Sequence, residues 1–460
     1  MAGPPELTDA SVGRGTVEER AALGRAARQA RARSTLGHWS PPADRPDAVD
    51  LLVAQGRSRL PELLPVRYGR MSVSPFTYLR GSPVVMANDL AATGDSGLRT
   101  QLCGDAHLSN FGAFGTAERR LVFDLNDFDE TLPGPFEWDV QRLCVSLLVA
   151  ARTSGQGEDA GRDAATAAAR SYRDHIGRLA ERTELEVWYE QIELTDAMTD
   201  YAGIVPPEQL ARNIEKTRHR TSTQVLGKLT EVVDGQRRIR HDPPLLVPFD
   251  DPSWFEMGQR VLDDYTTTLD GSRQVLLPRY HLVEFALKVV GVGSVATRCL
   301  IALLTGRDAD DVLFLQVKEA EASVLAPHAG ASGFTHHGQR VVEGQRLMQA
   351  ASDPFLGWTA GPFGRHYYVR QLRDMKGTVD VDGLPPAGLV AYGELCGRVL
   401  ARAHARAGDP VAIHAYLGGS DRFDTELSRF AVAYADQTER DFERFAGAVR
   451  SGELPVLEEQ

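Results

Sequence analysis

The sequence Gly104-Asp-Ala-His-Leu-Ser-Asn110, followed by Phe123-Asp-Leu-Asn-Asp127, is the most informative part of the chain. An aspartate and an asparagine five positions apart, Asp105 and Asn110, can face one point from a single tight loop. A carboxylate in such a loop can accept a hydroxyl proton, and an amide oxygen can bind a divalent cation. Asp124, one short hairpin later, adds an anionic oxygen ligand suited to Mg²⁺. This set fits phosphoryl transfer, in which catalysis consists mainly of positioning and charge neutralisation.

Each of these residues also has a structural explanation. Asp105 could cap a turn, His107 could be a core histidine with satisfied hydrogen bonds, and Asn110 could hold a left-handed turn. The acidic run over 124–130 could be a calcium loop, but its spacing does not match the EF-hand pattern. Asp127 is the alternative metal ligand if Asp124 does not face the site.

The quoted pattern, Gly-Asp-x-His-x-x-Asn followed by a hydrophobic residue and aspartate, resembles the catalytic and metal loops of aminoglycoside- and choline-type phosphotransferases of the protein-kinase-like fold. The stretch 137–143 resembles the structural aspartate and helix that follow those loops. The resemblance implies ATP and Mg²⁺ as cofactors and a hydroxyl-bearing, small-molecule acceptor. It implies that the catalytic residues are Asp105, His107 and Asn110, and that the metal ligands are Asn110 with Asp124 or Asp127.

A kinase-like fold also needs a glycine-rich hairpin over the nucleotide, a strand lysine for its phosphates, and a helix glutamate that holds the lysine. The candidates are Gly291 and Gly293 with Ser294 in the hairpin turn, Lys318 on a strand, and Glu343 on the next helix. They follow the catalytic loop, whereas ordinary kinases have them before it. We therefore infer a circular permutation, which is tolerated where the original termini lie close together.

From about Asp47 to its end, the chain resembles an uncharacterised bacterial family, domain of unknown function 2252. Four motifs carry this resemblance: Arg-Tyr-x-Arg-Met, Ser-Pro-Phe-x-x-Leu-Arg-Gly, Gly-Asp-Ala-His-x-x-Asn-Phe-Gly and Gln-Val-Lys-Glu-Ala. The family name implies no reaction.

The glycines of 291–296 also support a different function. They match the dinucleotide-binding pattern G-x-G-x-x-[GA], and Glu319 follows at the end of another strand, where it could bind a ribose. An oxidoreductase of this type needs a helix over 297–304, whereas the kinase-like hairpin needs a strand there. The short apolar run and the following Thr305-Gly306 turn favour the strand.

A third alternative is a nucleotide-binding pseudoenzyme or scaffold. In that case Lys318 would be an edge-strand residue paired with Glu319 or Glu321. Three arginines, Arg67, Arg70 and Arg80, could either hold an anionic substrate or pair with the acidic run, because the guanidinium fork suits both phosphate and carboxylate.

Composition limits the remaining possibilities. The 460 residues carry a formal net charge of -12, with Lys+Arg 51 against Asp+Glu 63, so nucleic acid is not an expected partner. The sequence contains no apolar run of membrane-spanning length and no secretory pattern near its start. Four scattered cysteines show no metal-binding spacing, which favours a reduced, cytoplasmic protein without a membrane partner.

These patterns predict an α+β, two-lobed protein. Residues 1–46 are expected to form an arm or strap, and 47–275 a helical lobe that holds the catalytic and metal loops. Residues 276–376 should form a small antiparallel, nucleotide-binding lobe, and 377–460 helices that complete the helical lobe. The glycine- and aromatic-rich motifs between Arg67 and Asp139 are expected to be loops on short strands.

Overall fold

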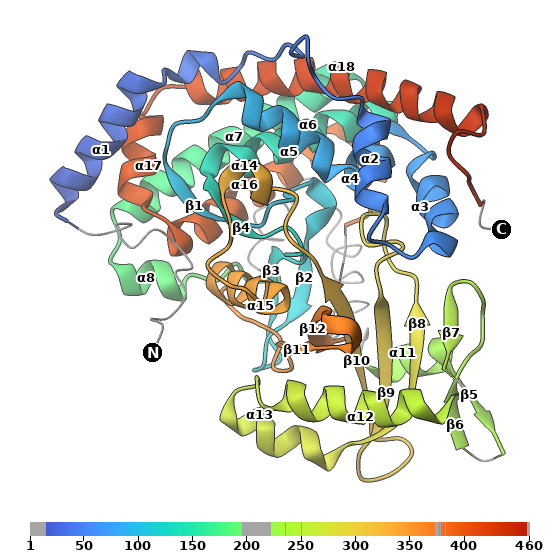
Figure 1. Ribbon diagram of the computed structural model, residues 1–460. Helices are drawn as coiled ribbons and strands as arrows, with labels where there is room; N and C mark the ends of the chain where they lie inside the picture. The colour runs from blue at the N-terminus through green and yellow to red at the C-terminus, as the bar shows by residue number, and fades with distance from the viewer. Residues whose placement is uncertain are drawn as a thin grey trace.

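The computed structural model describes residues 15–195 and 222–457, except 235, 250, 373–376, 378 and 382. It is a mixed α+β structure in which a helical part lies above a large antiparallel sheet in the view of Figure 1. The expected α+β class is therefore confirmed. Pairs of short strands lie between the two parts and carry the loops that the sequence analysis singled out.

Four long helices form the centre of the helical part: α6 (Phe136–Thr153), α7 (Glu158–Ala180), α16 (Pro386–Ala407) and α18 (Arg422–Arg450). The alanine-rich face of α7 lies directly against α16. A Cβ atom on Gly397 would lie 2.2 Å from the carbonyl oxygen of Ala168, so only glycine permits this close approach of the two backbones. The short helix α17 (Pro410–Leu417) also packs on α7.

The first described residues lie against this helical part. The helix α1 (Val17–Ala30) begins with a capping box formed by Thr16 and Glu19 and packs on α17. The Nε of Arg28 donates a hydrogen bond to the carbonyl oxygen of Tyr416 at 2.7 Å. A short 3₁₀ helix, η1 (Arg33–Thr35), follows.

Four further helices precede the catalytic loop: α2 (Ala48–Gly56), α3 (Leu64–Met71), α4 (Pro75–Gly81) and α5 (Pro83–Thr93), with η2 (Pro61–Leu63) between the first two. The motifs around Tyr68 and Phe76 were expected to be loops, and that expectation is wrong. In α4, Pro75 occupies the first helical turn, and Ser74 and Thr77 cap each other's backbone. These local signals start a helix without a long apolar periodicity.

Two short antiparallel pairs hold the catalytic segment. β1 (Arg99–Leu102) pairs with β4 (Leu132–Pro135), and β2 (Phe111–Gly115) pairs with β3 (Leu121–Leu125). The 3₁₀ helix η3 (Leu108–Asn110) lies between β1 and β2. The loop over 103–110 and the turn over 126–131 therefore lie next to each other.

The large sheet has the order β11-β12-β10-β9-β8-β7, and all its pairs are antiparallel. Its strands are β7 (Leu246–Pro248), β8 (His281–Lys288), β9 (Cys299–Thr305), β10 (Val312–Ala320), β11 (Gly357–Ala360) and β12 (His366–Gln371). The helices α14 (Ala326–Ala329) and α15 (His337–Met348) connect β10 to β11, and η5 (Pro362–Gly364) connects β11 to β12.

Side-chain alternation divides the sheet into two faces. Leu315, Val317 and Val369 face an apolar core that they share with Leu262 and Tyr265 of α12 (Pro252–Thr266). α13 (Gly271–Leu276) and η4 (Leu277–Arg279) follow α12. The opposite face of β10 carries Phe314 at one end and the buried polar side chains of Gln316 and Lys318 further along.

The boundary of the sheet part differs from the expected one near residue 276. α11 (Ser222–Leu229), the pair β5 (Thr230–Val233) and β6 (Gln236–Ile239), and β7 all precede that residue. Leu226 and Ile239 share an apolar cluster with Ile301 and Phe314 of the sheet. Burial against the sheet groups these residues with it, although their sequence suggests a helical stretch.

None of the described helices is long and apolar enough to cross a membrane.

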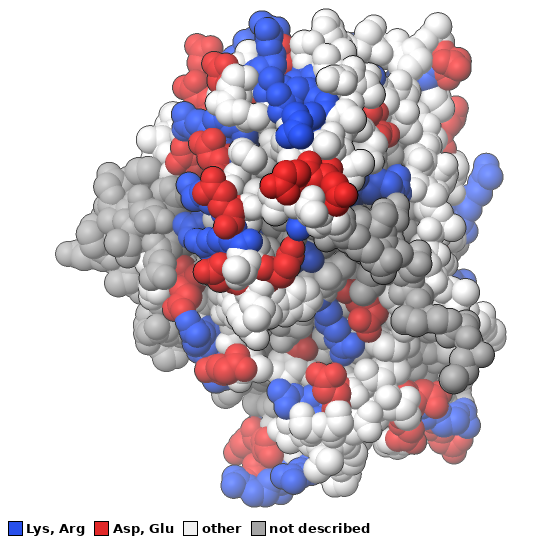
Figure 2. All heavy atoms as spheres, turned by 90° about the vertical axis from the view of Figure 1, so that its left-hand side faces the viewer, with Lys and Arg blue, Asp and Glu red and all other residues white. Residues whose placement is uncertain are grey.

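On the face shown in Figure 2, basic and acidic side chains are intermixed among the described residues. The short helix α8 (Glu184–Tyr189) follows α7.

Candidate active site

The loop over 103–110, which contains the candidate catalytic residues, is held on its inner side by a buried aspartate of α6. Asp139 accepts hydrogen bonds from the backbone N–H groups of Cys103 at 2.8 Å and Gly104 at 3.1 Å, and it lies 3.2 Å from Nε2 of His404. Gly104 has φ +84°, and a Cβ atom there would lie 2.2 Å from the carbonyl oxygen of Glu130. The helical part therefore anchors the loop, and the close approach to Glu130 requires glycine at position 104.

Asp105 lies at the exposed side of this loop. Its Oδ1 accepts a hydrogen bond from Nε of Arg142 at 2.8 Å, and its Oδ2 lies 3.7 Å from Nε2 of His107. Burial raises the pKa of Asp105, and Arg142 acts against that rise. Burial, together with Arg80 and Arg142, holds the pKa of His107 well below its usual value. His107 is therefore a neutral imidazole near neutral pH, beside a carboxylate that remains 20% exposed.

Asn110 connects the catalytic loop to the acidic run. Its Nδ2 donates hydrogen bonds to the carbonyl oxygens of Asp105 at 3.0 Å and Asp127 at 2.9 Å. Its Oδ1 accepts one from the backbone N–H of Asp127 at 2.6 Å. The structure thus brings Asp105, Asn110 and Asp127 together.

Asp124 has a different environment. Its Oδ1 pairs with Arg402 of α16 and accepts a hydrogen bond from the backbone N–H of Leu125 at 2.9 Å. Its Oδ2 accepts one from the N–H of Ala350 at 3.3 Å. Both side chains of the pair are at most 3% exposed. The carboxylate of Asp124 is therefore closed, whereas the side chain of Asp127, the alternative candidate, is 43% exposed.

Lys318 reaches this acidic run from the sheet. Its Nζ lies 2.6 Å from Oδ2 of Asp129 and 3.7 Å from Oδ2 of Asp127, and the hydroxyl of Tyr368 donates a hydrogen bond to Oδ1 of Asp129 at 2.6 Å. Burial opposes the charged ammonium, but the two carboxylates raise the pKa of Lys318 well above its usual value. Lys318 is therefore charged, and it pairs with neither Glu319 nor Glu321. Glu319 binds Arg298 and Arg365 instead.

The glycine loop lies over the same carboxylate. Oγ of Ser294 is 3.2 Å from Oδ2 of Asp129, and Gly291 has φ +66° at the turn of the hairpin. The segment that follows, β9, is a strand antiparallel to both β8 and β10. The predicted strand is confirmed, and the helix that a dinucleotide-binding site needs after its glycines is absent from this described segment.

The helical part holds the tip of this loop. Nη1 of Arg59 donates to the carbonyl oxygens of Gly293 at 2.8 Å and Val295 at 2.5 Å. The backbone N–H of Leu60 donates to Ala296 at 2.8 Å. Figure 1 shows the β8–β9 hairpin reaching toward α2 and α3.

Glu343 does not contact Lys318. It lies on α15, as expected, but its carboxylate pairs with Arg346 at 3.2 Å. The residue that α15 directs to the acidic run is Arg340, whose guanidinium donates to the carbonyl oxygens of Asp129 at 2.8 Å and Thr131 at 2.5 Å. Asp129 thus holds the lysine, and Arg340 holds the backbone of Asp129.

The three candidate arginines have three different positions. Arg67 is fully buried and donates to Gln55 at 2.7 Å and to the carbonyl oxygen of Gly81 at 2.8 Å, which is a structural role. Arg70 donates to the carbonyl oxygen of Gly291. Arg80 alone of the three lies near Asp105 and Asp127, whose carboxylates act on its pKa.

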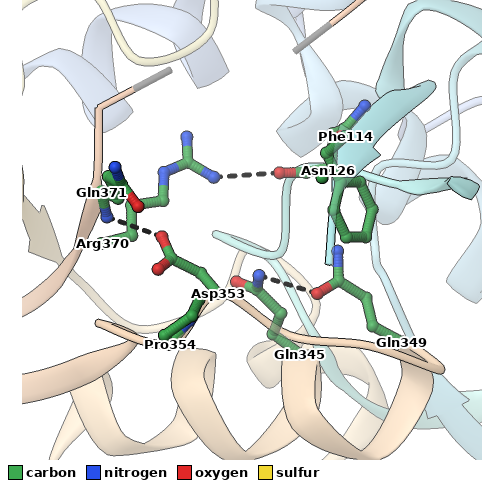
Figure 3. A pocket seen from close by; sticks show the side chains of 9 residues that line it. Phe114, Asn126, Gln345, Gln349, Asp353, Pro354, Arg370 and Gln371 are labelled. Atoms are coloured by element: carbon green, nitrogen blue, oxygen red, sulfur yellow. Dashed lines mark hydrogen bonds between the residues drawn. The ribbon is translucent and has the colours of Figure 1, made fainter. Parts of the chain in front are cut away.

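A polar pocket adjoins the site at the edge of the sheet (Figure 3). It is a small, open cavity of about 30 Å³ between β12, the end of α15 and the β2–β3 pair. Arg370 separates it from the acidic run by donating to the carbonyl oxygen of Asn126 at 3.0 Å, and Gln371 donates to Asp353 at 2.6 Å. The lining residues are Phe114, Gly115, Asn126, Gln345, Gln349, Asp353, Pro354, Arg370 and Gln371.

Among the described residues, no group of three or more His, Cys, Asp or Glu side chains could hold a metal ion. Mg²⁺ does not require such a cage, because it commonly binds one or two carboxylates, water and substrate phosphates. The exposed carboxylate of Asp127 fits that mode, whereas Asn110 is only 3% exposed and its amide oxygen already accepts the N–H of Asp127.

Sequence reasoning missed several residues of this site: Asp129, Arg142, Arg340 and Tyr368. Asp129 lies in the acidic run that was noticed as a group, so its charge was visible but its partner was not. Arg142 follows Asp139 by one helical turn, and that spacing places both side chains near the catalytic loop. Tyr368 lies opposite Lys318 in the strand register.

Comparison with curated proteins and with solved structures finds no match to the chain. The model of one family, described as an uncharacterized protein conserved in bacteria (DUF2252), matches residues 59–448. The matched range includes the catalytic loop, the acidic run, the glycine hairpin and Lys318. The chain therefore belongs to the DUF2252 family.

Proposed function

We propose that this protein is an ATP- and Mg²⁺-dependent phosphotransferase that acts on a hydroxyl-bearing small molecule. The observation that carries the proposal is the ion pair between Lys318 and Asp129 at 2.6 Å, with Asp127 at 3.7 Å. These partners are separated by 189 positions in the sequence. A phosphotransferase needs a cation for the nucleotide phosphates opposite a loop of acidic and amide groups, and this contact supplies both.

The proposed roles follow from the contacts. Asp105 is the general base, and Arg142 orients it. Lys318 binds nucleotide phosphates, and Asp129 holds the lysine in place of Glu343. Gly291, Gly293 and Ser294 allow the backbone of the hairpin to lie close to the phosphates.

Asp127, positioned by Asn110, would hold Mg²⁺, which neutralises charge on the phosphate oxygens when it is bound. The hydroxyl oxygen of the acceptor attacks the γ-phosphorus atom, and the bond from that atom to the β–γ bridging oxygen breaks. The electron pair of that bond leaves with ADP. The acceptor proton passes to Asp105, and the product is a phosphate monoester.

The finer fold assignment is part of the same proposal. The strands β8, β9, β10, β11 and β12 belong to one antiparallel sheet, and α15 lies between β10 and β11 in the chain. This sheet carries a hairpin turn and a lysine. These are the parts that a protein-kinase-like small lobe needs, and they follow the catalytic loop in the chain. This order supports a circularly permuted kinase-like fold.

A nucleotide-binding pseudoenzyme is the second candidate, and one observation favours it. Lys318 is only 2% exposed and already has a complete pair with Asp129, which also accepts a hydrogen bond from Tyr368. A lysine in that state supports a stable fold without turnover. The cytoplasmic location remains a proposal that rests on the free, buried cysteines.

Nucleotide titration with and without Mg²⁺ tests the proposal. We expect ATP or GTP to raise the melting temperature in an Mg²⁺-dependent way, and NAD and NADP to leave it unchanged. Asp105→Asn should lower the rate of phosphoryl transfer by about 10²–10⁴-fold. Its nucleotide affinity should stay within a few fold.

Nucleotide binding without any phosphoryl transfer would favour the pseudoenzyme. Absence of nucleotide binding in the wild-type protein would contradict both candidates.

A further inference from the structure

The catalytic Asp105 is surrounded by more positive charge than its own pairing needs. Arg142 donates to Asp105 with Nε at 2.8 Å and to the carbonyl oxygen of Leu79 with Nη2 at 2.7 Å. This second bond joins the end of α4 to the catalytic loop. The next residue of α4 is Arg80. A second arginine therefore lies where Arg142 joins α4 to Asp105.

Arg80 has no ionic partner among the described residues, although it is largely buried. Its Nε is buried without a hydrogen-bond partner. Its guanidinium carbon lies over the ring of Phe76, 5.9 Å from the ring centroid. Burial lowers the pKa of Arg80, while the carboxylates of Asp105 and Asp127 act in the opposite direction. Nε is the only Arg80 nitrogen that is buried without a partner among the described residues, and no carboxylate bonds the guanidinium, so this side chain can bind an added anion.

The position of Arg80 suits an anionic group of the acceptor, and not of the nucleotide. A Cβ atom on Gly293 would lie 3.3 Å from the carbonyl oxygen of Arg80, so the arginine lies under the glycine hairpin. The nucleotide phosphates already have Lys318 from the sheet. Arg80 comes from the helical part instead, and Asp105 is the first carboxylate that acts on it.

A second unused group lies beside it. Nδ1 of His107 is buried and has no hydrogen-bond partner among the described residues. An imidazole nitrogen can donate to or accept from a ligand hydroxyl, according to its tautomer. Both residues lie close to the base, because His107 is 3.7 Å from Asp105 and Arg80 follows Leu79, which Arg142 joins to Asp105; together they define the proposed anion recess.

We propose that the acceptor is a small hydroxyl-bearing anion, whose carboxylate or phosphate group binds Arg80 while its hydroxyl faces Asp105. This inference rests on the proposed function and specifies its substrate class. The site resembles phosphotransferases for cationic and sugar-like acceptors, so an anionic acceptor distinguishes this protein from them.

Four probes of similar size test the class of acceptor: glycerate, glycerol 3-phosphate, glycerol and choline. ATP consumption should rise with glycerate or glycerol 3-phosphate and stay at the background rate with glycerol and choline. The two anions separate a carboxylate-binding from a phosphate-binding recess. A preference for glycerol or choline would overturn the proposal.

Arg80→Gln identifies the residue responsible. We expect it to raise the KM for the preferred anion about 10- to 100-fold and to leave the KM for ATP unchanged, because a charge-assisted hydrogen bond is lost on the acceptor side only. Arg80→Lys should restore part of the affinity. Arg57→Gln, which removes an exposed arginine after α2, is the matched control and should change neither value. An equal rise in the KM for ATP would overturn the assignment and give Arg80 to the nucleotide.

A binding measurement without nucleotide separates this inference from the proposed function. Inorganic phosphate and glycerate should each raise the melting temperature of the wild-type protein more than that of Arg80→Gln. That result would support the anion recess even if no ATP turnover is found. Equal shifts in the two proteins would overturn it.

Discussion

Two ion pairs of the same acidic run have opposite environments. Asp124 and Arg402 are at most 3% exposed, and each oxygen of the carboxylate already has a partner. Five positions later, Asp129 is 29% exposed while its partner Lys318 is 2% exposed. A closed pair supports the fold, whereas a half-open pair leaves charge that a ligand can reach. The difference teaches that exposure of one partner, and not the presence of an ion pair, distinguishes a site from a structural contact.

Removal of the closed pair should have the largest effect. Arg402→Met leaves the Asp124 carboxylate buried without its cation, so the free energy of unfolding should fall by about 3–5 kcal/mol. Chemical denaturation measures this change. Burial already raises the pKa of Asp124 against the effect of Arg402, so the loss should be greater at pH 8, where the carboxylate must be charged, than at pH 5.

Arg170→Met is the matched control for that variant. Arg170 lies on α7 and forms an exposed ion pair with Glu394, which is on the same helix α16 as Arg402. Its removal should lower the free energy of unfolding by less than about 1 kcal/mol. Similar losses in both variants would mean that the closed pair contributes no more than a surface pair.

A buried carboxylate without a basic partner sharpens the comparison. Burial raises the pKa of Glu137 to about 7, and its Oε2 has no hydrogen-bond partner. Because the folded-state pKa exceeds the ordinary value of about 4.5, the wild-type protein should lose stability as the pH rises from about 4.5 to 7. Glu137→Gln should remove that loss, on the order of 3 kcal/mol, in denaturation curves at pH 5 and pH 8.

The exposed Glu118 provides the control for this pH dependence. Glu118→Gln should retain the wild-type slope of stability against pH. If Glu137→Gln also retains it, Glu137 is ionised in the folded protein at low pH and the predicted cause is wrong.

Removal of the half-open pair, Lys318 with Asp129, should affect ligand binding more than stability. Lys318→Met leaves Asp129 with Tyr368, Ser294 and solvent, so unfolding should become easier by only about 1–2 kcal/mol. Nucleotide affinity, measured by titration calorimetry, should fall about 10-fold or more. Lys228→Met, on the exposed side of α11, should leave both quantities unchanged. A loss of stability equal to that of Arg402→Met would assign Lys318 to the fold alone.

The smallest effect is expected at the predicted lysine partner. Glu343→Gln should change nucleotide affinity and transfer rate by less than about twofold, because Glu343 pairs with Arg346 and does not reach Lys318. Asp129→Asn should change both by more, since Asp129 holds the lysine. Equal effects of the two variants would restore Glu343 as a positioning residue.

Local patterns were sufficient for most elements. Apolar periodicity predicted α15, α16 and α18, and β9 followed from a short apolar run that ends at a Thr-Gly turn. The loop that contains Asp105 and Asn110 followed from residue type and spacing. These signals depend on neighbours within a few positions, so one sequence contains them in full.

Pairings between distant residues could not be predicted in the same way. The choice between Asp124 and Asp127 depends on strand alternation together with Arg402, which lies 278 positions from Asp124. Glu343 was placed on the right helix, but helix rotation directs Arg340 to the acidic run. The strands before residue 276 were missed because Leu226 and Ile239 gain their burial only against the sheet.

The anchored glycine hairpin has a thermodynamic consequence. Its tip is fixed by Arg59, Leu60 and Arg70, so the conformational entropy of ordering it is lost when the chain folds and not when a ligand arrives. These anchors favour a hairpin that is already ordered before a ligand binds. Any molecule that reaches Asp127 meets a preorganised wall, and its affinity carries no penalty for ordering that wall.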